Sequence, residues 1–355
     1  MRVYALMALA LLLALCSAVQ TRAGEVEGPY VYKSSIHINT QHYLVYWPSP
    51  TAKEPQYLTG SWAPRFDFNV QGPLEGGSQI SVSFFKPDGA KWLTRNLNTE
   101  ETAKDTFQHF MSDGLEMEKQ ATTQTGIFTI KIELSNALTK TDKTLFTGKF
   151  EVGKFHYGTA PNEKNQNDYF VNHDWTLPIG QMSFDTHGDA EAPKLLVSLW
   201  FRGPSNTSSV AGYLYFNGKQ ISSTKSMGGV HEAAIIRTGT TQEDMLWTRW
   251  TFHFARVAEA RKGNSANNYP DMWWLDKNPG DYEIKILRDG KLARSAKFTI
   301  GADGKLVDNG LAEKNNMGFG VILFPVNVEP GMDGKANTTN YKAQAYYGNS
   351  LVGFP

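Results

Sequence analysis

The stretch Gly-Asp-Tyr-Glu-Ile-Lys-Ile, residues 280–286, decides the predicted fold of this chain. It alternates polar with apolar side chains, so Tyr282, Ile284 and Ile286 would share one face of a β-strand. An almost identical stretch, Gly-Ile-Phe-Thr-Ile-Lys-Ile, occurs at residues 126–132. The recurrence predicts that one β unit is present twice in this chain of 355 residues, which is long enough for two domains.

Two other blocks recur in the same order. The Gly-Pro pair at residues 72–73 returns at 203–204, an offset of 131, and residues 149–153 return at 297–301, an offset of 148. The stretch quoted above has an offset of 154, so the second copy contains an insertion, which we place within residues 255–278. The alignment matches Phe84 with Tyr215, and it predicts a two-residue hairpin turn at Asn217-Gly218.

The stretch at residues 280–286 resembles the penultimate strand of immunoglobulin-like and fibronectin-III-like domains, in which a tyrosine begins a late strand at a corner of the sandwich. The resemblance implies a corner hydrogen bond from Tyr282, which Phe128 in the first copy cannot make because it has no hydroxyl. No cysteine pair is present, so the resemblance is to the cysteine-free members of this class. The layout is also similar to exported bacterial proteins that carry such modules in tandem.

The predicted fold class is therefore all-β, with two tandem immunoglobulin-like β-sandwich domains. Only residues 99–117 suggest a helix, because charged residues come early in that stretch, although Phe107 and Phe110 also suit a strand. A short strand is expected around Trp175. The expected order is a signal peptide at 1–23, a first sandwich with its lead-in at 24–158, a linker and first strand at 159–193, a second sandwich at 194–305, and a C-terminal tail packing on the body at 306–355.

The N-terminus is predicted to be a secretory signal peptide. Arg2 provides the positive start, residues 5–15 are all apolar, and cleavage is expected after Ala18 or Ala23. The apolar run is shorter than the roughly 20 residues of a transmembrane helix, so an uncleaved anchor is the less favoured alternative. We therefore expect an exported protein, periplasmic, cell-surface or extracellular, with no membrane span after signal cleavage.

The single cysteine, Cys16, lies inside this leader. A lipid anchor at Cys16 is an alternative, but Leu15 stands where a lipoprotein signal has a small residue. After cleavage no thiol would remain, which excludes cysteine nucleophiles, disulfides and cysteine-based zinc sites.

Charge and motifs narrow the function classes. The chain has 35 basic and 35 acidic residues, and it lacks the basic excess typical of a nucleic-acid-binding protein, so no nucleic-acid partner is expected. None of the eight histidines has the spacing of a helical zinc site, and neither a serine elbow nor a phosphate-binding loop is present. His173 with Asp174 could contribute to a metal site, but a polar surface loop is the favoured interpretation. Asp303 and Asp333 lie in glycine-containing turns that match no calcium loop. We predict no catalytic, metal or cofactor-binding residue and no cofactor.

Aromatic residues supply the candidate ligand-binding site. Tyr269, Trp273 and Trp274 lie in the insertion of the second copy. Adjacent tryptophans on a strand point to opposite faces, so one of the pair could form a platform for a sugar or peptide, while the alternative is that both pack inside. Another aromatic group, at 247, 250, 252 and 254, is predicted to face the core.

The leading functional hypothesis is a non-enzymatic exported binding or structural module that acts through protein–protein contacts. The alternatives are a carbohydrate-binding protein that uses the exposed aromatic residues of the second unit, and a hydrolase with a cleft between the two domains. A protein or glycan partner is expected, and the sequence leaves the oligomeric state open.

Overall fold

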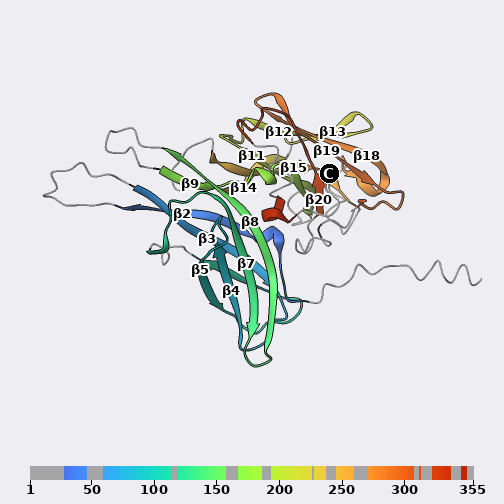
Figure 1. Cartoon of the computed structure of the whole chain (residues 1–355). Helices are drawn as coiled ribbons and strands as arrows, with labels where there is room; N and C mark the ends of the chain where they lie inside the picture. The colour runs from blue at the N-terminus through green and yellow to red at the C-terminus, as the bar shows by residue number, and fades with distance from the viewer. Residues whose placement is uncertain are drawn as a thin grey trace, which may run out of the picture.

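The computed structural model describes residues 28–45, 59–112, 119–156, 167–185, 193–225, 228–236, 245–259, 271–307, 312, 322–336 and 345–349. These residues form mainly antiparallel sheets with one short α-helix, so the predicted all-β fold class is confirmed and the arrangement is compatible with a β-sandwich. Figure 1 shows two groups of strands, one from β2 to β8 and the other from β11 to β19. The predicted leader at 1–23 lies outside the described residues. Within the described part, no helix is long and apolar enough to cross a membrane.

Two sheets contain the strands of the first group. In sheet I, β3 pairs with β1, β2 and β6, and in sheet II the order is β5-β4-β7-β8-β9. The bounds in sheet I are β1 (Tyr30–Val31), β2 (His37–Val45), β3 (Thr59–Gln71) and β6 (Phe107–Ser112). The bounds in sheet II are β4 (Ser78–Phe85), β5 (Lys91–Asn98), β7 (Gly126–Asn136), β8 (Thr141–His156) and β9 (Asn167–Val171).

Two further sheets contain the second group. Sheet III has the order β14-β15-β11-β10-β20, and sheet IV has the order β13-β12-β18-β19-β21. The bounds in sheet III are β10 (Ile179–Asp185), β11 (Lys194–Arg202), β14 (Gly229–Ile236), β15 (Trp247–Ala255) and β20 (Ile322–Pro325). The bounds in sheet IV are β12 (Val210–Phe216), β13 (Lys219–Ser223), β18 (Gly280–Arg288), β19 (Lys291–Ile300) and β21 (Asn327–Val328).

The order of strand pairing recurs between the groups. The run β5-β4-β7-β8 in sheet II has the same order as β13-β12-β18-β19 in sheet IV, and β2-β3-β6 has the same order as β10-β11-β15. Register agrees as well, because Gly126 pairs with Val152 on β8, whereas Gly280 pairs with Ile300 on β19. These pairs are the positions that the sequence alignment equates.

One predicted match is wrong by a single residue. Phe84 pairs with Ile130 in sheet II, but Ile284, which corresponds to Ile130, pairs with Leu214 rather than with Tyr215. Leu214 is fully buried, whereas Tyr215 points to the opposite face and is half-buried. A shift of one residue in a strand exchanges its two faces, so burial identifies Leu214 as the equivalent of Phe84.

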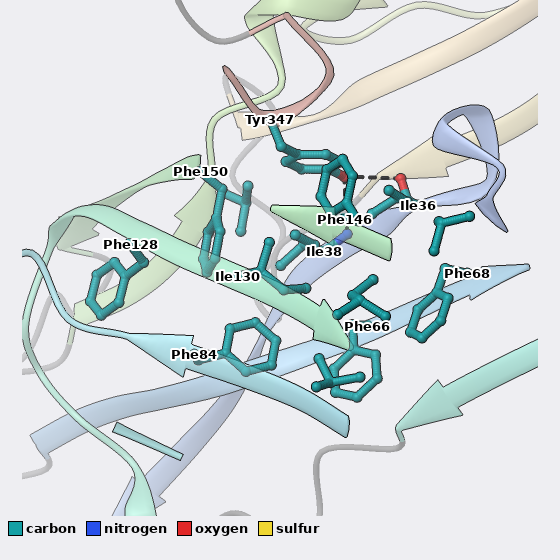
Figure 2. Packing of buried hydrophobic residues seen from close by; sticks show 14 of the residues in the cluster. Ile36, Ile38, Phe66, Phe68, Phe84, Phe128, Ile130, Phe146, Phe150 and Tyr347 are labelled. Carbon is teal, nitrogen blue, oxygen red and sulfur yellow. Dashed lines mark hydrogen bonds between the residues drawn. The ribbon is translucent and has the colours of Figure 1, made fainter. Parts of the chain in front are cut away.

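Each group has a hydrophobic cluster between its sheets, and the first cluster also includes Ile179 and Leu323 from sheet III. The first cluster lies between sheets I and II, where Phe66, Phe84, Phe128 and Phe150 pack closely (Figure 2). The second lies between sheets III and IV and contains Tyr282 with the other apolar residues of its stretch. The predicted inward faces of both repeated stretches are therefore confirmed.

The aromatic group on β15 is divided between two faces. Trp250, Phe252 and Phe254 lie in the second cluster, as expected, but Trp247 packs on the opposite face with Leu177 in a third, small cluster. The expectation that all four residues face the same core is wrong at Trp247, because 247 and 250 are an odd number of residues apart on a strand.

Two local predictions are also wrong. The stretch at 99–117 is not helical where it is described, since its residues 107–112 form β6 in sheet I. Trp175 lies in a 3-10 helix, η4 (Asp174–Thr176), rather than in a strand. Within residues 159–193, β9 joins sheet II and β10 joins sheet III, so each group of strands receives one strand from this stretch.

The C-terminal segment contacts both groups of strands. β20 pairs with β10 in sheet III, and β21 pairs with β19 in sheet IV. The helix α4 (Ala345–Gly348), red in Figure 1, places Tyr347 against the first cluster. The Tyr347 hydroxyl donates to the Ile36 carbonyl at 3.1 Å and accepts from the Ile38 amide at 3.1 Å (Figure 2).

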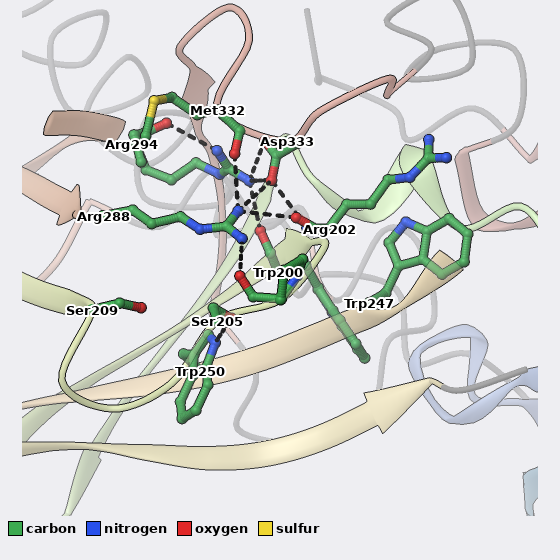
Figure 3. Close-up of polar contacts among 12 residues, drawn as sticks. Trp200, Arg202, Ser205, Ser209, Trp247, Trp250, Arg288, Arg294, Met332 and Asp333 are labelled. Carbon is green, nitrogen blue, oxygen red and sulfur yellow. Dashed lines mark hydrogen bonds and ion pairs between the residues drawn. The ribbon is translucent and has the colours of Figure 1, made fainter. Parts of the chain in front are cut away.

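A buried ionic cluster fixes the preceding turn. Asp333 accepts hydrogen bonds from the Arg294 guanidinium at 2.8 Å and from the Arg202 amide at 3.0 Å, and the Arg288 guanidinium lies 3.9 Å away (Figure 3). Asp333 therefore joins the C-terminal segment to sheets III and IV.

Candidate functional site

Two of the three aromatic candidates predicted from the sequence, Trp273 and Trp274, make hydrogen bonds in the structure. Trp273, on the two-residue strand β17 (Trp273–Trp274), is half-buried, and its indole Nε1 donates to the Tyr282 hydroxyl at 3.1 Å. The Tyr282 hydroxyl in turn donates to the Asn278 carbonyl at 2.7 Å, which is the corner hydrogen bond that the resemblance implied. Trp273 thus helps to hold the Tyr282 hydroxyl in the position where it bonds to the Asn278 carbonyl.

Of the other two aromatic candidates, the structure describes only Trp274. Trp274 is half-buried, and its carbonyl accepts a hydrogen bond from Nδ2 of the Asn278 side chain at 2.7 Å. Tyr269 lies outside the described residues. A ligand-binding role for Tyr269, Trp273 and Trp274 stays a prediction.

A cavity of about 40 Å³ lies where the two groups of strands meet. One wall is the outer face of sheet III, where Trp200 on β11 stands directly opposite Arg249 on β15. The facing walls come from the 3-10 helix η1 (Lys33–Ser35), the start of β2, the helix η4 and α4. The space holds a few water molecules or a small chemical group, since a single water needs at least ~10–15 Å³.

His173 is the most unusual group at this cavity. Its exposed fraction is 1%, and its Nε2 atom is buried without a hydrogen-bond partner. The pKa of His173 is lowered to about 3, chiefly by burial and to a smaller extent by the nearby His37, while a backbone hydrogen bond to Ile38 acts in the opposite direction. The imidazole is therefore neutral at physiological pH and offers a hydrogen bond without a charge.

The surface-loop interpretation of His173 and Asp174 is wrong. Asp174 is fully buried, where its carboxylate accepts from Arg202 Nη1 at 2.9 Å and from Trp247 Nε1 at 3.1 Å. The Arg202 guanidinium also lies 5.2 Å from the Trp247 ring centre. These partners come from β11 and β15, so tertiary contacts compensate the burial of a segment whose sequence is polar.

Two cations line the same cavity. Burial lowers the pKa of Lys33 and also that of Arg249, so both ammonium and guanidinium groups have lost part of their hydration. The Arg249 guanidinium lies 5.7 Å from the Trp200 ring centre, and its Nε atom is buried without a partner. Neither cation forms an ion pair with a carboxylate of the described residues, and none of the described residues that line the cavity is acidic.

The described residues contain no group of three or more histidine, cysteine, aspartate or glutamate side chains able to hold a metal ion. Asp303 stabilises a turn, because its carboxylate accepts from the Lys305 amide at 3.1 Å. Asp333 is engaged by Arg294.

A second candidate is the surface of β6. Among the strand residues whose exposure the structure describes, two large apolar side chains on the same strand are exposed only on β6, Phe107 at 57% and Met111 at 54%. It pairs with β3 along one edge, and no described strand pairs with its other edge. The strand has no lysine, arginine, aspartate or glutamate, which are the residues that commonly protect such edges.

Sequence reasoning missed these surfaces for identifiable reasons. Lys33, His173 and Arg249 are far apart in the chain and meet only after the sheets pack. The exposed strand β6 has apolar residues at 107, 110 and 111. This spacing also suits a helix, so the sequence did not identify the segment as a strand.

Comparison with protein-family models found no match, and comparison with curated proteins found none either. The fold alone therefore places the chain among all-β proteins built from packed antiparallel sheets.

Proposed function

We propose that this protein is an exported, non-enzymatic binding module that acts through protein–protein contacts, with β6 as its contact strand. The observation that carries the proposal is the unpaired edge of β6 beside the exposed side chains of Phe107 and Met111. A partner strand could add to this edge and obtain backbone hydrogen bonds, while the two apolar side chains provide selectivity.

The surface is already ordered before a partner arrives. The Phe107 ring packs edge-on against Tyr32 at 6.2 Å, and His109 shares a hydrogen bond of 2.8 Å with Asn69 on the neighbouring strand. Preorganised contacts reduce the entropy that binding must overcome. The β6 surface is therefore better suited to recognition than an apolar side chain on a turn, such as Leu138.

We further propose that the chain consists of two tandem immunoglobulin-like β-sandwich domains behind a cleaved leader. The support is the recurring strand order, in which three strands of one sheet face four of the other, together with the corner hydrogen bond of Tyr282. Export is proposed from the leader alone, and N-terminal sequencing of the mature protein tests it by locating a cut after Ala18 or Ala23.

The binding proposal is tested by affinity capture with paired variants. The double substitution Phe107→Ser with Met111→Lys places a charge on the strand edge and is expected to reduce recovery of the partner about tenfold, which corresponds to about 1.4 kcal/mol. Leu138→Ser is the matched control, because Leu138 is 80% exposed but lies in the turn between β7 and β8. Equal recovery by the double variant and the control, with both folded by circular dichroism, would contradict a role for β6.

A further inference from the structure

We propose that the cavity between the two groups of strands is a carboxylate-binding site, with Arg249 and Lys33 contacting the carboxylate and His173 Nε2 bonding to a neighbouring polar atom of the ligand. The site is separate from β6 and does not rest on the proposed function. Its ligand is a small carboxylic acid or the carboxylate end of a larger molecule.

The first argument is that Arg249 lacks a carboxylate partner among the described residues, whereas three other buried arginines of the second group each have one. Arg202, Arg288 and Arg294 have carboxylate oxygens at 2.9, 3.9 and 2.7 Å, respectively. Arg249 has no such partner among the described residues, although it has lost hydration too. Because a partly buried cation without a counter-charge is costly, an anion in the cavity would supply the missing partner.

Lys33 adds a second positive charge from the opposite wall. It extends from η1 of the first group, whereas Arg249 comes from β15 of the second, and both line the same space. An anion between them would interact favourably with both cations. The described lining residues provide no acidic side chain that could do so.

His173 provides a neutral polar atom at the same place. Its Nε2 atom lacks a partner, although the side chain is almost entirely buried and lines the cavity. Buried polar atoms in native proteins nearly always have hydrogen-bond partners, so we expect a group that is not part of the protein to bond to this atom. A water molecule or a polar atom beside the carboxylate of a ligand would satisfy it.

The size and shape of the cavity favour a carboxylate. An apolar cavity of ~150 Å³ binds a benzene molecule, so a space of about 40 Å³ accepts a group of only a few atoms. The rings of Trp175 and Trp200 line it, and a guanidinium binds a planar carboxylate with two parallel hydrogen bonds. The rest of a larger ligand would extend past His37, whose side chain is 46% exposed.

The test uses the full mature chain and four probes: acetate, N-acetylglycine, N-acetylglycinamide and inorganic phosphate, each titrated at constant ionic strength and followed by calorimetry. Saturable binding of acetate and N-acetylglycine, without binding of the amide, is expected. Stronger binding of N-acetylglycine than of acetate would identify the end of a peptide-like molecule as the better ligand, and the reverse order would identify a free small acid; either supports the site. No saturable binding of either carboxylate overturns the proposal, and so does tighter binding of phosphate than of both carboxylates.

Variants locate the site. Arg249→Met is expected to weaken acetate binding about tenfold or more, since it removes a charge-assisted pair of hydrogen bonds. Lys219→Met, at an exposed position on β13, is the matched control and should bind as the wild type does. If Arg249→Met does not fold, Arg249→Lys preserves the charge and should bind several-fold more weakly because the two-bond geometry is lost. Wild-type affinity in a folded Arg249 variant would overturn the assignment.

Discussion

Removing the charge of Asp333 should destabilise the protein far more than the same change at the surface. The substitution Asp333→Asn preserves the shape of the side chain but leaves the Arg294 guanidinium charged in a dry site. Arg294 Nη2 lies 2.7 Å from the Asp333 carboxylate, and the side chains are 0% and 2% exposed (Figure 3). Breaking a buried ion pair by removing one partner typically costs about 3–5 kcal/mol.

The expected value lies near the lower end of this range. Arg294 keeps hydrogen bonds to the carbonyls of Trp200 and Ala293, both at 2.9 Å, and these still solvate the charge in part. An asparagine oxygen can also still accept from the Arg202 amide. We therefore expect a loss of about 3 kcal/mol in the free energy of unfolding.

The matched control is Asp271→Asn. Asp271 also pairs with an arginine, Arg256, at 2.9 Å, but its side chain is 75% exposed. Exposed pairs contribute about 0–1 kcal/mol. The assay is urea unfolding, combined with hydrogen exchange of the amides in β19, which reports the stability of the strand that carries Arg294. Agreement of the two variants within about 1 kcal/mol would refute the conclusion that this ion pair matters for stability.

Three further predictions concern buried polar groups. Tyr347→Phe should cost about 1–3 kcal/mol and accelerate hydrogen exchange at the Ile38 amide, because that amide loses its acceptor; unchanged exchange would contradict the hydrogen bond. Tyr282→Phe should lower the unfolding free energy by about 1–2 kcal/mol in urea, since the Asn278 carbonyl loses its donor, and a neutral effect would exclude a stabilising corner. His173 binds a proton in the unfolded state below about pH 6.5 but in the folded state only below about pH 3, so the free energy of unfolding should fall as pH falls between these values, by up to about 1.4 kcal/mol per pH unit. The variant His173→Gln should show a shallower dependence of the unfolding free energy on pH. Equal pH dependence in the variant and the wild type would refute the lowered pKa.

Local patterns predicted the repeated strands well. The alternation in residues 280–286 determined which side chains enter the core, because a strand with one buried face must place its apolar residues at every second position. The hairpin turn at Asn217-Gly218 is also confirmed, with φ values of 47° and 77°, which asparagine and glycine adopt most easily. Both features depend only on neighbours in the sequence.

Features that depend on distant residues could not be predicted. Asp174 is buried because Arg202 and Trp247 lie beside it, 28 and 73 residues further along the chain. Without these partners, a histidine followed by an aspartate is typical of a surface loop. Arg249 and Lys33 are ordinary cations in the sequence, and only the packing of sheet III against η1 brings them to one cavity.

The hydrogen bonds of Tyr347 have a consequence for the order in which the protein is made. The Tyr347 hydroxyl bonds to residues that precede it by 311 and 309 positions, so the first hydrophobic cluster receives Tyr346 and Tyr347 long after its first strand has been synthesised. A chain truncated just before α4 would contain every described strand but would lack the side chains of Tyr346 and Tyr347 that pack on this cluster. We expect proteases to degrade such a product faster than a chain that contains α4, because part of the cluster would lack its cover.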